Sequence, residues 1–238
     1  MNKLPIGTFI NMGAVLLGGS IGLLLQQTFS APMQEIVFQA IGLGTLVIGI
    51  QMSTNMPEGY LLAIIFSLIA GGLIGVGINL EGLIDQTGEY LKNQLGSTDA
   101  RFSEGLIAAF LLFCMGSMTI LASIEEGMHG KRDLIKVKSL LDGVSSIAFT
   151  ATYGIGVMVV IFPMFIYQGG LTLLSRQART LTKPAIVQSL SSTGGMLIVG
   201  IGINMLGLGD IQLEALLPSI VIIVIYAWFK ETQLRKMR

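Results

Sequence analysis

The sequence predicts an all-α fold, a polytopic bundle of transmembrane helices with about seven or eight membrane segments, two of them short or re-entrant. Three observations carry this prediction. Of the 238 residues, 52% are hydrophobic and only 12% are charged, which is about half the charged fraction of a soluble domain. The mean hydropathy is +0.77. Apolar stretches of the roughly 20 residues that a spanning helix needs recur along the whole chain.

This composition excludes several classes of protein. A chain with so little charge cannot cover a globule in water, so a soluble enzyme, a disordered tail and a nucleic-acid-binding protein are excluded. The lipid bilayer is the expected environment. The 14 basic and 14 acidic residues balance, so no polyanionic partner is implied. The 31 glycines suit closely packed membrane helices.

Six apolar stretches are interpreted as spans, in order 5–25, 33–52, 58–80, 102–124, 184–206 and 215–229. The first stretch is longer than the 7–15-residue core of a signal peptide, so we expect it to be retained. The linker 81–101 is polar, but Ile84, Leu91 and Leu95 fall near one helical face. This pattern predicts a short amphipathic helix on the outer membrane surface.

The stretch 139–175 decides the topology. As one helix its 37 residues would be about 55 Å long, nearly twice the hydrocarbon thickness of about 30 Å. With two crossings here and a cytoplasmic N-terminus, twelve of the fourteen basic residues lie inside and only Lys92 and Arg101 lie outside. A single crossing gives nine against five at best. The positive-inside rule therefore predicts eight segments, with both termini cytoplasmic.

An internal repeat is suggested by residues 75–82, GVGINLEG, and 200–207, GIGINMLG, which share five of eight positions at an offset of 125. The same offset relates 59–80 to 184–205 and 34–50 to 159–175. Glycine-rich apolar segments also resemble one another through composition alone. The shared asparagines favour duplication.

We therefore expect one integral membrane domain, residues 1–238, with repeat halves 1–124 and 132–230. Transporters are often built from such repeats and bind solutes near the repeat interface.

Asp142 is the most informative polar residue, because it lies four residues inside an apolar stretch. A carboxylate at that depth is costly and suggests function. Two structural explanations stay open: a carboxylate capping a helix near the inner interface, or an ion pair with Lys136 or Lys138. Hydroxyl side chains follow Asp142 and would line one wall of a polar pathway; the first are Ser145 and Ser146.

Other polar groups complete the expected substrate or ion pathway. They are the amides Asn11, Asn79 and Asn204, the carboxylates Glu125 and Glu126, and the run Ser191, Ser192 and Thr193. The polar run suits an unwound or water-facing segment, and the two glutamates would concentrate cations near the mouth that holds Asp142. Hydrogen bonding between helices, and a solvated helix end for the glutamates, are the structural alternatives.

No catalytic constellation is present in the sequence. There is no Ser-His-Asp set, no phosphate-binding lysine loop and no pair of cysteines. The single cysteine, Cys114, and the single histidine, His129, indicate neither a disulfide nor a metal site. We expect no enzyme and no cofactor.

Two functions fit these features. The first is a secondary transporter or channel for a small ion or metabolite, with a polar site between two repeat halves. The second is a non-transporting scaffold or regulatory subunit packed through its glycine-rich helices, which would also suit a homo-oligomer.

Several segments together resemble the YqgA/YdfK-like family of uncharacterised bacterial membrane proteins. They are the opening GTFIN at 7–11, GAVLLGGSIG at 13–22, GSMTILASIEEG at 116–127, SLLDGVSSIAF at 139–149 and IYQGGLTLLS at 166–175. The resemblance covers the whole chain. It implies residence in the bacterial inner membrane and supplies neither a substrate nor a site.

Overall fold

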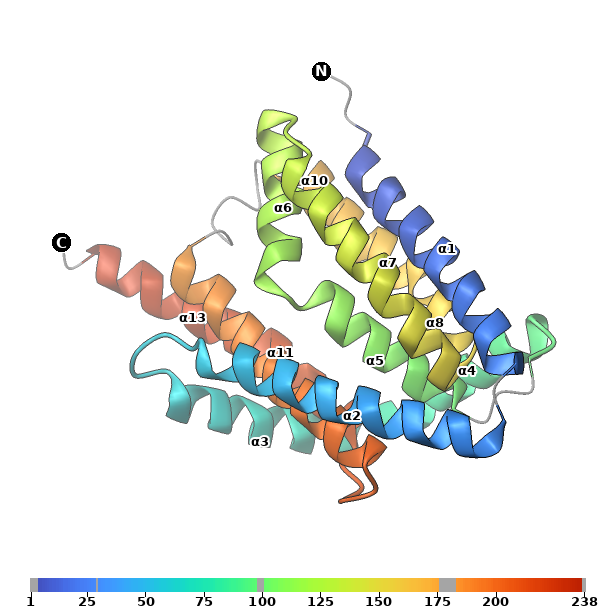
Figure 1. The fold of residues 1–238 in the computed structure, drawn as a ribbon. Coiled ribbons are helices and arrows are strands. Elements are labelled where there is room, and N and C mark those ends of the chain that lie inside the picture. The colour runs from blue at the N-terminus through green and yellow to red at the C-terminus, as the bar shows by residue number, and fades with distance from the viewer. Residues whose placement is uncertain (1–3, 29, 98–100, 176–182, 237–238) are drawn as a thin grey trace.

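The computed structural model describes residues 4–28, 30–97, 101–175 and 183–236, and it contains helices and no strand within these ranges (Figure 1). The elements are α1 Ile6–Thr28, α2 Ala31–Thr54, α3 Leu61–Gly77, α4 Leu80–Gln94, α5 Phe102–Cys114, α6 Ser117–His129, α7 Asp133–Tyr153, α8 Gly156–Val159, α9 Ile161–Met164, the π-helical η1 Phe165–Gly169, α10 Gly170–Leu173, α11 Pro184–Met205, α12 Leu213–Leu216 and α13 Pro218–Lys236.

The prediction of a polytopic helical bundle is confirmed. Five helical segments of the described chain are long and apolar enough to cross a membrane, and the number rises to seven if each of two bent pairs is one span. The pair α3–α4 bends by 64° and the pair α5–α6 by 59°. Helix α7 has 21 residues, which gives it a length of about 30 Å. It is not counted among these apolar segments because it contains several charged side chains.

The stretch 139–175 forms two helical legs, as its length suggested. Helix α7 ends at Tyr153 and is capped by Gly154, whose φ of +77° suits glycine. The second leg consists of α8, α9, η1 and α10. The second leg returns to the end of the bundle where α7 begins, because Thr172 and Ser175 pack against Gly127 of α6.

The predicted helix in the linker 81–101 is present as α4. The expected span at 102–124 is interrupted, because Gly116 adopts an extended conformation and separates α5 from α6. Thr119 Oγ1 donates across this break to the Phe113 carbonyl oxygen at 2.8 Å.

The polar run in α11 does not unwind as we expected. The hydroxyl groups of Ser189 and Thr193 donate to carbonyl oxygens three and four residues earlier in the helix, so their hydrogen bonds are made inside a continuous helix.

Two closely packed helix pairs build the bundle (Figure 1). Helices α1 and α7 run parallel, because Gly7 faces Ile135 near their starts and Gly22 faces Ile147 and Thr150 farther along. Helices α2 and α11 run antiparallel through glycines of both helices. Without Cβ atoms at these positions, the backbones approach closely.

The bundle therefore has two distinct ends. The first, here called the N-terminal end, holds the start of α1, the α6–α7 turn and the start of α11. The opposite end holds α4, the start of α5, the end of α7 and the end of α11 (Figure 1). Among the basic residues that the predicted topology places inside, Lys3, Arg176, Arg179 and Arg238 lie outside the described residues.

Candidate functional site

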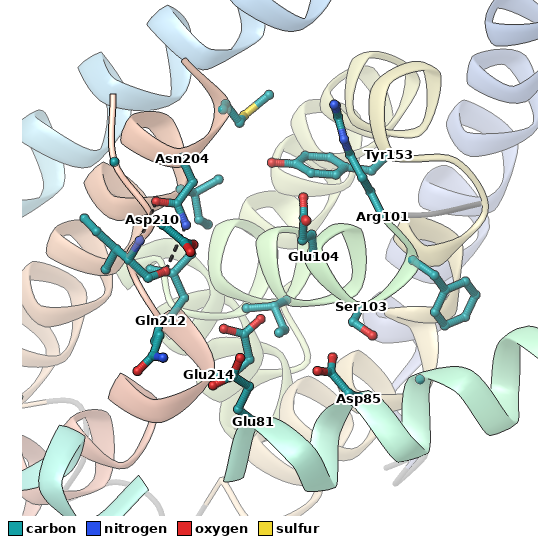
Figure 2. Close-up of a pocket in the computed structure, with 18 of the residues that line it drawn as sticks. Glu81, Asp85, Arg101, Ser103, Glu104, Tyr153, Asn204, Asp210, Gln212 and Glu214 are labelled. Carbon is teal, nitrogen blue, oxygen red and sulfur yellow. Dashed lines mark hydrogen bonds between the residues drawn. The ribbon is translucent and has the colours of Figure 1, made fainter. Parts of the chain in front are cut away.

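An acidic vestibule of about 710 Å³ opens at the end of the bundle opposite the N-terminal end. Its walls come from α4, the start of α5, the end of α7, the end of α11 and the loop that leads into α12 (Figure 2). Six carboxylates and two basic side chains line it: Glu81, Asp85, Glu89, Glu104, Asp210 and Glu214, with Lys92 and Arg101. The lining therefore has a strong excess of negative charge, and such a cleft attracts cations.

Helix α4 supplies one wall of the vestibule. Glu81, Asp85 and Glu89 recur every four residues, so they share one helical face with about 6 Å of rise between neighbours. Glu104 stands on the first turn of α5, and Figure 2 shows Glu214 entering from α12. Glu214 interacts electrostatically with Asp85 and Glu81 of α4 and with Glu104, so four carboxyl groups share this space.

Asn204 fixes the opposite wall. Its Nδ2 donates to the Ile211 carbonyl oxygen and its Oδ1 accepts the Ile211 N–H, both at 2.8 Å (Figure 2). These two bonds hold the turn that follows α11, where Gly207 has a φ of +67°. Asn204 therefore shapes the vestibule, as a wall residue rather than as part of a buried site.

Aromatic side chains form the inner boundary of the vestibule. Phe38 lies edge-on to Tyr153 at 5.8 Å between ring centroids, and Tyr153 lies 6.0 Å from Phe149. The Arg101 guanidinium sits 4.1 Å from the centre of the Phe38 ring, a cation–π contact. Phe38 and Tyr153 belong to the lining of the vestibule, and Tyr153 is itself part of the buried core.

A second polar group, here called the Asp142 cluster, lies deeper in the bundle and consists of Asn11, Lys138, Asp142 and Gln168. Lys138 and Asp142 form an ion pair although they are only 5% and 7% exposed. Asn11 Nδ2 donates to Asp142 Oδ2 at 2.8 Å and to Gln168 Oε1 at 3.1 Å. The predicted pathway included Asn11 and Asp142, with Lys138 as one possible ion-pair partner of Asp142, and the fold brings these three residues together.

The position of Asp142 decides between the readings that the sequence left open. Asp142 is the tenth residue of α7, which places it about 13 Å from the start of the helix and about 16 Å from Tyr153 at its end. A role in capping the helix near the interface is therefore wrong. The ion pair with Lys138 is confirmed, and Lys136 points outward, where it is exposed.

Glu126 makes a third polar contact, at the N-terminal end. Its Oε1 accepts the Gly7 backbone N–H at 2.8 Å and pairs with Arg132 Nε at 2.7 Å. The carboxylate thus satisfies one of the free N–H groups of the first turn of α1. Glu125, its neighbour, is only half-buried.

The remaining predicted residues lie apart from these groups. Ser146 donates to the Val15 carbonyl oxygen at 3.1 Å and joins α7 to α1, whereas Ser145 is half-buried. Asn79 is exposed at the α3–α4 bend with a φ of +52°. Helix α11 buries Ser191, Ser192 and Thr193. The next residue, Gly194, packs against Met115 at the α5–α6 break.

Sequence reasoning missed the carboxylates of the vestibule. The four-residue spacing of Glu81, Asp85 and Glu89 was a local signal, but nothing local indicates that Asp210 and Glu214 face them. Among the described residues no group of three or more His, Cys, Asp or Glu side chains could hold a metal ion.

Comparison with known proteins places this chain in a family. The family described as "Protein of unknown function (DUF554)" matches residues 6–228. The "Uncharacterized membrane protein YdfK" of Bacillus subtilis (strain 168) is 31% identical over 229 residues, which cover 93% of this chain and 97% of the relative. The "Uncharacterized protein YqgA" of Escherichia coli (strain K12) is 29% identical over 225 residues, 91% of this chain and 94% of the relative. No solved structure matches. This membrane protein therefore belongs to the DUF554 family.

Proposed function

We propose that this protein is a secondary transporter or channel for a small ion or solute, and that its cargo is cationic. The acidic vestibule carries the proposal: a cavity of about 710 Å³ is large enough for a hydrated ion or a small metabolite. Its negative lining would raise the local concentration of cations at the mouth.

Two further observations support transport over a purely structural role. The 59° bend between α5 and α6 would divide one span into half-helices, an arrangement that transporters use around binding sites. The Asp142 cluster places a buried ion pair near the middle of α7, where charged groups commonly mark an ion path. The duplication predicted from the GVGINLEG and GIGINMLG segments would place the site between repeat halves and stays a proposal.

The orientation follows from charge. The basic α6–α7 turn, with Lys131 and Arg132, belongs to the N-terminal end, while the vestibule end carries Lys92 and Arg101. The positive-inside rule then puts both termini in the cytoplasm and opens the vestibule to the outside of the bacterial inner membrane. A cysteine introduced at Arg132 should react with a membrane-impermeant reagent only from inside, and one at Asp210 only from outside.

Proteoliposomes test the function. The probes are Na⁺, K⁺, methylammonium and guanidinium, with chloride and phosphate as the anionic comparison. At least one cation should enter, and Glu104→Gln with Glu214→Gln should reduce its entry about tenfold, equivalent to 1.4 kcal/mol. Raising the ionic strength with an impermeant salt should also slow the entry, because the field is screened.

Glu58→Gln is the matched control, since Glu58 is an exposed carboxylate in the α2–α3 turn, outside the vestibule. Uptake equal to that of empty liposomes for every probe would reject transport and favour the scaffold. Selective entry of the anions would reject the cationic cargo.

A further inference from the structure

The Lys138–Asp142 pair holds two opposite charges in the interior of the bundle. Both side chains are more than nine-tenths buried. Removing two charges from water costs several kcal/mol per ion, and a buried pair rarely stabilises a fold more than apolar packing would. Packing alone is therefore a poor explanation for this pair in the middle of a membrane helix.

Unused hydrogen-bonding atoms surround the pair. Asn11 Nδ2 is oriented by Asp142, Gln168 and Met164, whose Sδ lies at 3.5 Å. This orientation leaves Asn11 Oδ1 buried without a partner, and Gln168 Nε2 is also unpartnered. Asn11 and Gln168 are both fully buried. Such atoms cost free energy unless something else binds them.

The backbone around the cluster is shaped to bring these atoms together. Gln168 lies in η1, a single π-helical turn, and π-helical turns occur frequently at functional sites. Away from η1, the close contact of Gly18 in α1 with Gly143 and Ser146 in α7 holds these two helices together. Asn11 and Asp142 are thereby kept within hydrogen-bonding distance.

We propose that Asp142 and Asn11 form a binding site for a monovalent alkali cation, Na⁺ or K⁺, and that Lys138 occupies it as a tethered cation in this conformation. The carboxylate of Asp142 and the unpartnered Asn11 Oδ1 are oxygen ligands, which hard cations prefer, whereas Gln168 Oε1 already accepts from Asn11 Nδ2. When the Lys138 ammonium swings away from Asp142 toward the N-terminal end of the bundle, a monovalent ion bound at Asp142 replaces its single charge and keeps the site neutral. A divalent ion would leave one uncompensated charge.

The order of groups along α7 fits this exchange. Lys138 lies one turn from Asp142 toward the N-terminal end, whereas Tyr153 and the vestibule lie on the other side. A cation from the vestibule would meet Asp142 before it meets Lys138. The inference rests on the proposed function in naming this route, but binding at Asp142 can be measured without transport.

Thermal unfolding of the purified protein in detergent tests the site. Lys138→Met removes the tethered charge and leaves an unbranched side chain that is one heavy atom shorter. At a hundredfold excess over the dissociation constant, NaCl or KCl should raise its Tm by about 5–10 °C relative to N-methyl-D-glucamine chloride of equal ionic strength. The wild type should need higher concentrations for the same shift, because Lys138 competes.

The double variant Lys138→Met, Asp142→Asn should lose the alkali-specific shift, and Lys136→Met, an exposed lysine of the same helix, should respond as the wild type does. Equal shifts in Lys138→Met and in the double variant would overturn the proposal. If Lys138→Met folds only in NaCl or KCl, the site is supported. If Lys138→Met folds in none of the salts tested while the double variant folds, the site is rejected.

If neither variant folds, the wild type decides. An alkali-specific shift supports the site and its absence rejects it. Failure of the vestibule variants to alter flux, with an intact alkali shift, would reject the proposed route alone.

Discussion

Replacing Gly18 by alanine should loosen the contact that holds the Asp142 cluster together. A Cβ at Gly18 would overlap the carbonyl oxygen of Gly143 and Ser146 Oγ, and it would lie 3.0 Å from the Gly143 carbonyl carbon. Carbon atoms prefer separations of about 3.5–4.0 Å, so α1 and α7 must part by at least about 0.5 Å. The contact at Gly22, where a Cβ would lie 2.9 Å from Thr150 Cβ, limits how locally this can happen.

Gly13→Ala provides the matched control, since Gly13 lies in the same helix and a Cβ there meets nothing within 4 Å. In both variants, replacing glycine by alanine inside a helix favours the helix by about 1 kcal/mol relative to the wild type. Their difference therefore isolates the steric penalty, about 1–3 kcal/mol for overpacking. For a chain of this size, Gly18→Ala should unfold several degrees below Gly13→Ala.

Cys114 gives the assay. It is the only cysteine of the sequence and is fully buried, so a thiol-reactive fluorophore should label it only on unfolding. Labelling during a temperature ramp yields a Tm for each variant. Equal Tm values for Gly18→Ala and Gly13→Ala would show that α1 and α7 are not in close contact at Gly18, which would refute the packing argument.

Two further predictions concern the ends of the bundle. Asn204→Ala removes both hydrogen bonds to Ile211 and should cost about 1–3 kcal/mol; faster proteolysis of the 206–212 loop than in Asn79→Ala would show it, and equal rates would contradict it. Glu126→Ala removes the acceptor shared by Gly7 and Arg132 and should cost a similar amount. Glu125→Ala should be nearly neutral, as denaturant unfolding of both variants can check.

The sequence predicts the helices well because their signals are local. Apolar length located the spans, the spacing of Ile84, Leu91 and Leu95 located α4, and the excess length of the stretch 139–175 indicated that the chain turns back after α7. Asp142 was equally visible, since a carboxylate inside an apolar run is unusual wherever the chain goes next.

Three features of the structure were not predicted from the sequence, and each has a physical reason. The break between α5 and α6 contains no proline, and it is closed by Thr119 bonding to Phe113, which composition cannot reveal. The run 188–193 looked too polar to stay helical, yet Ser189 and Thr193 bond to their own helix. The vestibule joins carboxylates that lie more than a hundred residues apart, Glu81 and Glu214 among them.

The two helix pairs suggest how an acidic vestibule and a buried cation site could communicate. Glycine contacts make α1–α7 one unit and α2–α11 another, and the vestibule lies where they meet, between Tyr153 of α7, Phe38 of α2 and Asn204 of α11. Under the proposed function, a cation passes Tyr153 only if the two units move apart there, because the ring of Phe38 packs against Tyr153.

A flexible bis-maleimide linker between Phe38→Cys and Tyr153→Cys, in a Cys114→Ala background, should therefore block cation flux. The same reagent applied to Phe38→Cys alone or to Tyr153→Cys alone, which cannot join the two units, should leave the flux of that variant unchanged. Undiminished flux through the Phe38–Tyr153 crosslink would mean that the two units need not separate at Tyr153. The route from the vestibule to Asp142 would then have to avoid the aromatic boundary.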